Sequence, residues 1–207
     1  ITEIMQNPAI VDDADGEWFE IVNTSDVTFD LMGLVIADEG SDSHTVASTL
    51  LIAPGETIVF GANGDFATNG GVVVDYVYSG ITLGNGADEI VLFNSGVVID
   101  QVAYDNGASF PDPAGASMFL AYDALTADAN DSGSAWEESY APIDIDSDFG
   151  TPGQPPPAVC FDATDLGSAV APNVATGNTT GAPDIFQPSC VNPSTGGDAA
   201  FYWTAPS

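Results

Sequence analysis

The chain has 207 residues, of which 31 are Asp or Glu and one is His, and it has neither Lys nor Arg, so its formal net charge is −31. This charge excludes nucleic-acid binding through a basic surface, and the missing side chains exclude Lys Schiff bases, arginine fingers and P-loop chemistry. Hydrophobic residues make up 44% of the chain, which is enough for an ordinary core. No apolar run approaches the ~18 residues of a membrane span, and we expect no membrane insertion.

Short β-forming segments follow one another along most of the chain, with Gly, Asn, Asp and Pro between them. The predicted strands are 18–22, 29–36 (interrupted at Gly33), 45–52, 56–60, 72–78, 89–93, 97–104 and 117–121. The hairpin that turns at Asn94-Ser95-Gly96 is the clearest of these signals. Since no window carries a helical stripe, the regular spacing predicts an all-β fold, a β-sandwich.

Three consecutive prolines close the segment 154–157, which is predicted to be a linker because proline cannot join a sheet ladder. It separates a domain over residues 1–153 from residues 158–207, which are few for an independent core. The chain ends just after an apolar strand at Phe201, Tyr202 and Trp203. We therefore expect an incomplete β-module, whose free edge a strand of a neighbouring chain would complete.

Two features indicate secretion. The first residue is Ile1 rather than Met, which fits a mature chain after signal-peptide removal, with simple trimming as the alternative. Cys160 and Cys190 lie in no CxxC motif and next to no His, so a structural disulfide is favoured over a metal or redox site.

Calcium binding is predicted at the first acidic segment. Asp12, Asp13, Asp15 and Glu17 place four carboxylates within six residues, with Gly16 at the bend, and Ca²⁺ takes six to eight oxygen ligands from such loops. The segment lacks the distal Glu and the flanking helices of an EF-hand, and a solvated acidic loop is the alternative. Weaker candidates are Asn130 and Asp131 with Asp128, and the alternating Asp144, Asp146 and Asp148.

Enzymatic activity is not expected. His44 is the only histidine, it lies in a polar segment, and no G-x-S-x-G motif is present to expose a nucleophile. Carboxylate pairs suited to glycoside hydrolysis are unspecific in so acidic a chain. An aromatic carbohydrate platform built from Trp136, Tyr140 or Trp203 is an alternative, although aromatic residues of sandwiches more often belong to the core.

The order of motifs resembles that of bacterial lamin-tail domains. Ile1–Pro8 reads I-x-E-I-x-x-N-P, and residues 16–23 read G-E-W-F-E-I-V-N, as those domains do. The similarity continues through 31–34 (with Leu34 where Trp is usual), 52–55, 83–88, 100–104, 130–131, Trp136 and 150–153. It covers about residues 1–153 and implies an immunoglobulin-like sandwich.

The remaining residues resemble the first part of a PPC-like β jelly-roll module of secreted bacterial proteins. The similarity rests on Cys160, 166–168, 181–184, 188–190 and 198–206. Such modules continue into further strands that this chain lacks.

These observations predict a non-catalytic structural or adhesion protein of the cell surface. It would assemble with copies of itself into a filament or surface layer, through strand complementation and calcium. The alternative is an accessory module of a larger secreted hydrolase or nuclease, since lamin-tail-like domains often accompany such enzymes.

Overall fold

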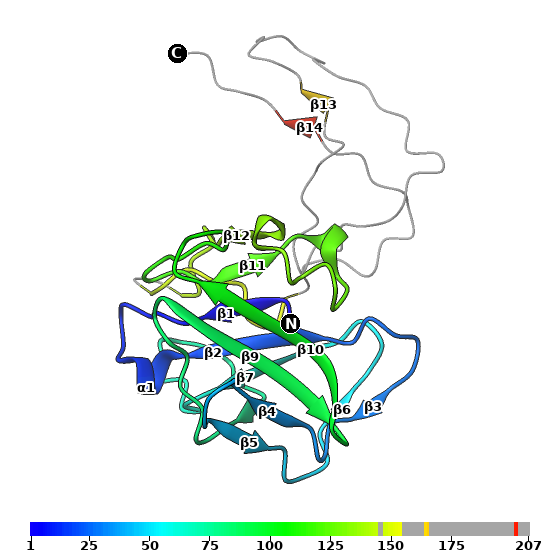
Figure 1. Cartoon of the computed structure of the whole chain (residues 1–207). Coiled ribbons are helices and arrows are strands. Elements are labelled where there is room, and N and C mark those ends of the chain that lie inside the picture. Colours follow the sequence, from blue (N-terminus) through cyan, green and yellow to red (C-terminus); the bar gives the residue numbers. More distant parts are fainter. Residues whose placement is uncertain (145–146, 155–163, 166–200, 203–207) are drawn as a thin grey trace, which may run out of the picture. The chain divides into compact units, whose positions relative to one another are not determined.

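A computed structural model describes residues 1–144, 147–154, 164–165 and 201–202 (Figure 1). The chain divides into two compact units, Ile1–Pro157 and Ala158–Ser207. In the second unit the described residues form two strands, β13 (Thr164–Asp165) and β14 (Phe201–Tyr202), which pair in parallel.

The larger sheet of the first unit has six strands in the order β12-β11-β1-β2-β7-β8. Their bounds are β1 Glu3–Met5, β2 Trp18–Val22, β7 Thr57–Gly61, β8 Tyr76–Val77, β11 Met118–Leu120 and β12 Trp136–Glu138. Neighbouring strands are antiparallel except β7 and β8, which are parallel.

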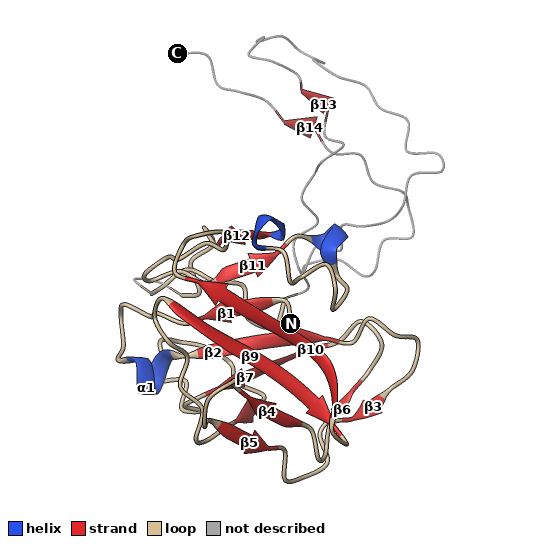
Figure 2. Ribbon diagram, viewed as in Figure 1, coloured by secondary structure: helices blue, strands red, loops and turns tan. Residues whose placement is uncertain are grey.

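The smaller sheet has four antiparallel strands in the order β10-β9-β4-β5. They are β4 Val35–Ala37, β5 Ser43–Thr45, β9 Ala87–Asn94 and β10 Val97–Asp105. A separate pair joins β3 (Phe29–Asp30) to β6 (Leu51–Ile52). The helices are one-turn pieces, α1 (Asp13–Gly16), η1 (Tyr122–Ala124) and η2 (Gly133–Ala135) (Figure 2).

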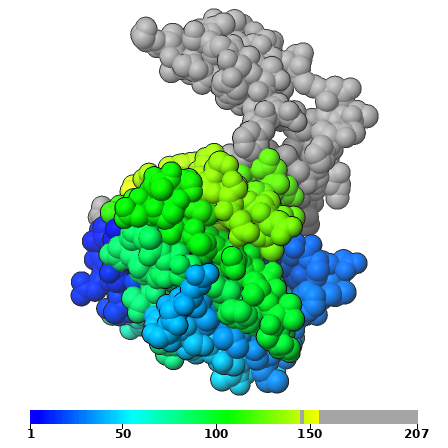
Figure 3. All heavy atoms as spheres, in the orientation of Figure 1, coloured from blue at the N-terminus to red at the C-terminus, as the bar shows by residue number. Residues whose placement is uncertain are grey.

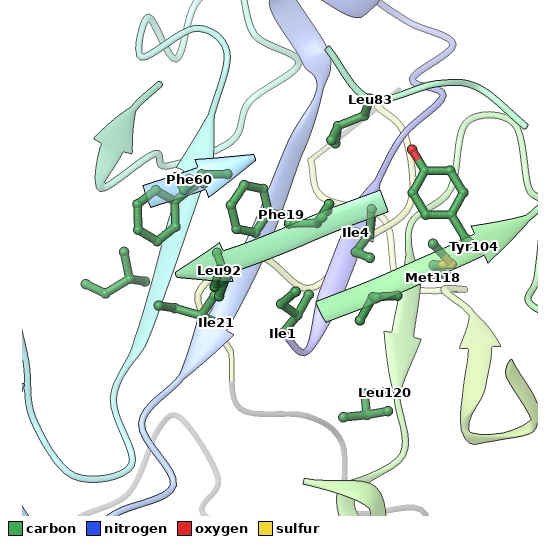
Figure 4. Close-up of a cluster of buried hydrophobic side chains, with 14 of the residues drawn as sticks. Ile1, Ile4, Phe19, Ile21, Phe60, Leu83, Leu92, Tyr104, Met118 and Leu120 are labelled. Atoms are coloured by element: carbon green, nitrogen blue, oxygen red, sulfur yellow. The ribbon is translucent and has the colours of Figure 1, made fainter. Parts of the chain in front are cut away.

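The two sheets pack face to face around one apolar core (Figure 4). Ile4, Phe19 and Phe60 enter it from the larger sheet, and Leu92 enters it from the smaller one. The rings of Phe19 and Phe60 stack with their centroids 5.2 Å apart. This arrangement confirms the predicted all-β, immunoglobulin-like sandwich.

The outer face of the larger sheet is also covered. Trp18 points away from the main core and packs with Met5, Val59 and Val72 in a second apolar cluster. The segment that leads to residue 153 lies over this face, with Gly150 against the Trp18 ring. Strand β2 is therefore buried on both faces, which explains why Trp18, Phe19 and Glu20 are all inaccessible.

The interruption predicted at Gly33 within 29–36 is confirmed, whereas the continuous strand predicted over 45–52 is wrong. Residues 29–36 form β3 and β4, which belong to different sheets, and residues 45–52 contribute only the end of β5 and the strand β6. The chain crosses between the sheets in both places, and the crossing is fixed by hydrogen bonds from Val46 N to Leu34 O (2.9 Å) and from Leu31 N to Leu50 O (2.8 Å).

The predicted strand 72–78 is reduced to β8, because side chains take over the backbone hydrogen bonds of its first half. The Asn69 amide receives Val72 N (3.0 Å) and donates to Val72 O (2.8 Å). The Asp75 carboxylate then accepts Val59 N (2.9 Å), a bond that a strand backbone would otherwise make.

Candidate functional site

The predicted calcium segment is split by the fold. Asp13 and Asp15 lie on the one-turn helix α1, where Asp15 N and Gly16 N donate to Asp12 O (2.9 and 3.0 Å). Asp12 and Asp15 are exposed, and Asp15 Oδ1 accepts a hydrogen bond from Asn63 Nδ2 (3.0 Å). Glu17 is buried and is directed away from this turn, so the four carboxylates do not form one ligand set.

Glu17 fastens the loop that precedes β9. Its Oε2 accepts the backbone N–H of Leu83 (2.9 Å), and its backbone carbonyl accepts the Tyr78 hydroxyl (3.3 Å). Burial raises the pKa of Glu17 from 4.5 to about 7; the Leu83 hydrogen bond lowers it, and the nearby carboxylates of Asp13, Asp88 and Asp42 raise it further. Oε1 of this side chain has no hydrogen-bond partner among the described residues.

The most enclosed carboxyls belong to Glu3 and Glu20, which face each other across β1 and β2 on the outer face of the larger sheet. Glu3 accepts Ser117 Oγ (2.5 Å), Thr151 N (2.7 Å) and Thr151 Oγ1 (2.7 Å). Glu20 accepts Thr2 Oγ1 (2.8 Å) and Gly153 N (2.7 Å). The two carboxyls thus hold the segment 151–153 against the first two strands.

This carboxyl pair has no Lys or Arg to neutralise it, because the chain contains none. Burial raises the pKa of Glu20 to about 8; the Thr2 hydrogen bond opposes that shift, and the neighbouring Glu3 adds to it. Burial likewise raises the pKa of Glu3, against the hydrogen bonds from Ser117 and Thr151. A proton is therefore part of the folded arrangement at neutral pH.

Glu3 and Glu20 lie in the two motifs at the start of the chain, but their burial was not predicted from the sequence. A signal was available: in β2, Glu20 has the same phase as Trp18, and an aromatic residue on that face indicates that something covers it. The Gly-Thr-Pro-Gly segment at 150–153 supplies the donors.

The weaker acidic candidates differ in their surroundings. Asn130 is buried and acts as a donor, from Nδ2 to Ile1 O (3.2 Å) and to the Asp100 carboxylate (3.0 Å), while Asp131 is exposed. Partial burial and the carboxylates of Asp100 and Asp128 raise the pKa of Asp131. Asp148 accepts Ala9 N (2.9 Å), and Asp146 lies outside the described residues.

Among the described residues, no group of three His, Cys, Asp or Glu side chains converges as a metal site would require. Calcium binding at each of the three predicted segments stays a prediction. Cys160, Cys190 and Trp203 lie outside the described part of the chain, so the disulfide and the last residue of the assembly edge stay predictions as well. No helix in the described part is long and apolar enough to cross a bilayer.

The single histidine has a structural environment. His44 Nε2 lies 3.1 Å from the Tyr76 hydroxyl, and Nδ1 lies 3.1 Å from Ser79 N. The aromatic residues considered for carbohydrate binding separate: Trp136 is a core residue whose Nε1 donates to Asn130 O (2.8 Å), whereas Tyr140 is 76% exposed.

An apolar groove of about 500 Å³ lies between the end of β2, the β3–β6 pair and the β9–β10 turn. Its floor includes Ile21, Leu34, Ile52 and Leu92. No histidine or cysteine lines it, and Asp30 and Asp100 are its only carboxylates, so it suits apolar chains better than chemistry on a polar substrate.

Comparison with known proteins agrees with this geometry. The family model of the lamin tail domain matches residues 1–106, which is just over half of the chain and includes both sheets up to the end of β10. The structure adds β11, β12 and the segment up to residue 153 to the same sandwich. No curated protein matches the chain, and the PPC-like resemblance of its second unit stays a prediction. By its family match and its fold, the chain belongs to the lamin tail domain family.

Proposed function

We propose that the chain is a non-catalytic structural or adhesion module of a secreted or cell-surface protein, which assembles with copies of itself into a filament or surface layer. Membership of the lamin tail domain family suggests a structural module. The observation that carries the proposal is the structural role of the buried Glu3 and Glu20 carboxyls. Burial raises the pKa of Glu3 and raises that of Glu20 to about 8, as is common for catalytic acids, yet the oxygens of both side chains are occupied in fastening segments of the domain.

Assembly of such chains requires cations from solution. Every copy carries a net charge of −31 and no cationic side chain, so two copies repel each other unless salt or divalent ions screen them. Asp12 and Asp15 are exposed on and beside α1, where they are accessible to calcium from solvent. The strand β14, with Trp203 after it, is the proposed edge for strand complementation between copies.

Light-scattering mass in millimolar calcium and in EDTA tests this proposal. We expect an assembly in calcium that returns to the 21.2 kDa monomer in EDTA. The triple variant Asp12→Asn, Asp13→Asn, Asp15→Asn should need more calcium, whereas Asp26→Asn, Asp65→Asn, Asp123→Asn, which removes as many acidic charges from other exposed positions, should assemble as the parent does.

Deletion of residues 199–207 tests the strand edge separately. We expect the shortened chain to remain monomeric in calcium. Unchanged assembly after the deletion would contradict strand complementation, and a 21.2 kDa mass of the parent chain in both buffers would contradict self-assembly.

The alternative function is that of an accessory module of a larger secreted hydrolase or nuclease. It is favoured by the apolar character of the groove, which leaves chemistry to another domain. A catalytic domain in the same reading frame would support it, and further β-modules or a sorting tail would support the structural role.

A further inference from the structure

Strand β10 leaves one edge of the smaller sheet open. Within the described residues nothing pairs with its outer side. Its first three residues, Val97, Val98 and Ile99, are 66%, 48% and 50% exposed. Edge strands of monomers are normally protected by Lys and other charged side chains, by Pro, by β-bulges or by short length; this strand spans nine residues, and the only such device at its apolar first three residues is a bulge at Ile99. The edge is therefore a template on which a further strand can pair.

The apolar groove begins at this edge. Val97 and Ile99 line it, together with Phe29, which is itself 49% exposed. The pairing of β10 with β9 shifts between Val98 and Asp100, so Ile99 has no partner on β9. Figure 3 shows the blue atoms of the β3 region beside the green atoms of the β9–β10 hairpin on the face of the molecule that carries the groove.

Two carboxylates stand among these apolar residues. Asp30 lines the groove, and hydrogen bonds from Met32 N and Leu50 N lower its pKa, which keeps it ionised. Asp100 lines the groove as well, where it forms an ion pair with the N-terminal ammonium of Ile1 and accepts a hydrogen bond from Asn130 Nδ2, so Asp30 is the carboxylate of the groove that has no cation beside it among the described residues. A second copy of this chain would bring only more negative charge to the groove, whereas a cationic partner would be attracted from a distance.

We propose that the β10 edge and the groove bind an extended segment of a basic partner polypeptide. The segment adds a strand to β10 through main-chain hydrogen bonds, and its alternate apolar side chains enter the groove. A Lys or Arg side chain of the segment lies near Asp30, and the net charge of −31 attracts the other cationic side chains. This inference goes beyond the proposed self-assembly and does not depend on it, because the surface and the partner are both different.

The test is a selection of displayed random peptides of about ten residues, a length that spans a typical strand, on the full chain immobilised in EDTA. We expect enriched peptides to alternate apolar residues and to carry Lys or Arg. Their affinity should fall at least tenfold between about 0.05 M and about 0.5 M salt, as screening predicts.

The double variant Val97→Lys, Ile99→Lys should weaken binding of the enriched peptides by at least about tenfold. Val73→Lys is the control, since Val73 is 68% exposed but lies away from the groove. The affinity of this variant for the enriched peptides should stay within about twofold of the parent's. Asp30→Asn removes a charge without adding bulk, and it should reduce the salt dependence of peptide affinity. This variant tests the proposal independently of whether the double variant folds.

Three outcomes would overturn the proposal. The first is enrichment of peptides without cations, and the second is equal binding to the double variant and the parent. The third is a dimer in EDTA that Val97→Lys, Ile99→Lys dissociates, which would make a second copy the occupant. None of these outcomes bears on the calcium-dependent assembly, which is measured on the chain without peptide.

Discussion

The free energy of unfolding should fall as the pH rises from about 5 to about 9, the opposite of the behaviour of most small proteins. Glu17 and Glu20 have folded pKa values of about 7 and about 8, above the 4.5 of an unfolded glutamate, and that of Glu3 is raised too. The folded chain therefore binds more protons than the unfolded chain in this range. The stabilisation is complete below pH 4.5 and is lost as the pH passes through 7 and 8.

The ionisation of Glu20 alone should lower the free energy of unfolding by about 2–4 kcal/mol. This is less than the whole pKa difference between the folded and unfolded chains would give, because an ionised carboxyl draws water into its site. Urea denaturation at a series of pH values measures it. Glu20→Gln removes the ionisation and keeps one acceptor oxygen, which serves either Thr2 Oγ1 or Gly153 N but not both, so the variant should start less stable and lose less stability with rising pH.

Glu137→Gln is the matched control, since Glu137 lies exposed on β12 of the same sheet. Its pH profile should follow that of the parent. A parent stability that is constant or rises between about pH 5 and about pH 9 would show that the buried glutamates are ionised in the folded chain.

Stability should also decline in strong acid, for a different reason. Hydrogen bonds from Ser109 Oγ, Ser109 N and Phe110 N lower the pKa of Asp105 to about 2, below the 3.8 of an unfolded aspartate. That contribution is present above pH 3.8 and is lost as the pH falls towards 2. The free energy of unfolding should therefore be greatest in mildly acidic solution. This range lies above the pH at which Asp105 becomes protonated and below the pH at which the buried glutamates ionise.

The elements that the sequence predicted best are those in which local pattern and tertiary environment agree. Strand β2 has the predicted bounds, and the β9–β10 hairpin turns at Ser95 and Gly96, whose positive φ angles of 52° and 79° are those of a tight hairpin turn. The strand predicted over 72–78 is wrong in its first half, because the side chains of Asn69 and Asp75 make hydrogen bonds that a neighbouring strand would otherwise make. Residue propensity carries no information about that competition.

For the acidic segments too, local sequence carries no information about the tertiary contacts that decide where each carboxylate lies. Spacing alone placed Glu17 with Asp12, Asp13 and Asp15, but Glu17 shares the phase of Phe19, which is an inward-facing core residue. Strand period therefore indicated that Glu17 is directed into the protein. Its partner, Leu83 N, lies far away in sequence, and only the fold brings the two together.

Gly133→Ala should destabilise the whole sandwich, because the turn that contains it packs directly against backbone. A Cβ at Gly133 would lie 2.4 Å from the carbonyl carbon of Ser109 and 2.6 Å from Phe110 N. Neither atom can move aside as a flexible side chain could. The turn would have to shift, and with it Trp136, whose ring packs on Phe110 with centroids 6.1 Å apart. We expect a loss of about 2–4 kcal/mol.

Thermal unfolding followed by near-ultraviolet circular dichroism measures this loss, which should lower the melting temperature by roughly 5–10 °C. Gly40→Ala is the matched control: Gly40 is exposed, and its added Cβ would crowd only the Asp38 carboxylate, a side chain that can shift at the cost of its hydrogen bonds from Gly40 N and Asp42 N. Gly133 lies beyond residue 106, where the family match ends. Equal melting temperatures for the Gly133→Ala and Gly40→Ala variants would mean that the segment after β10 does not belong to the cooperative domain, whereas the expected difference would place its boundary after β12.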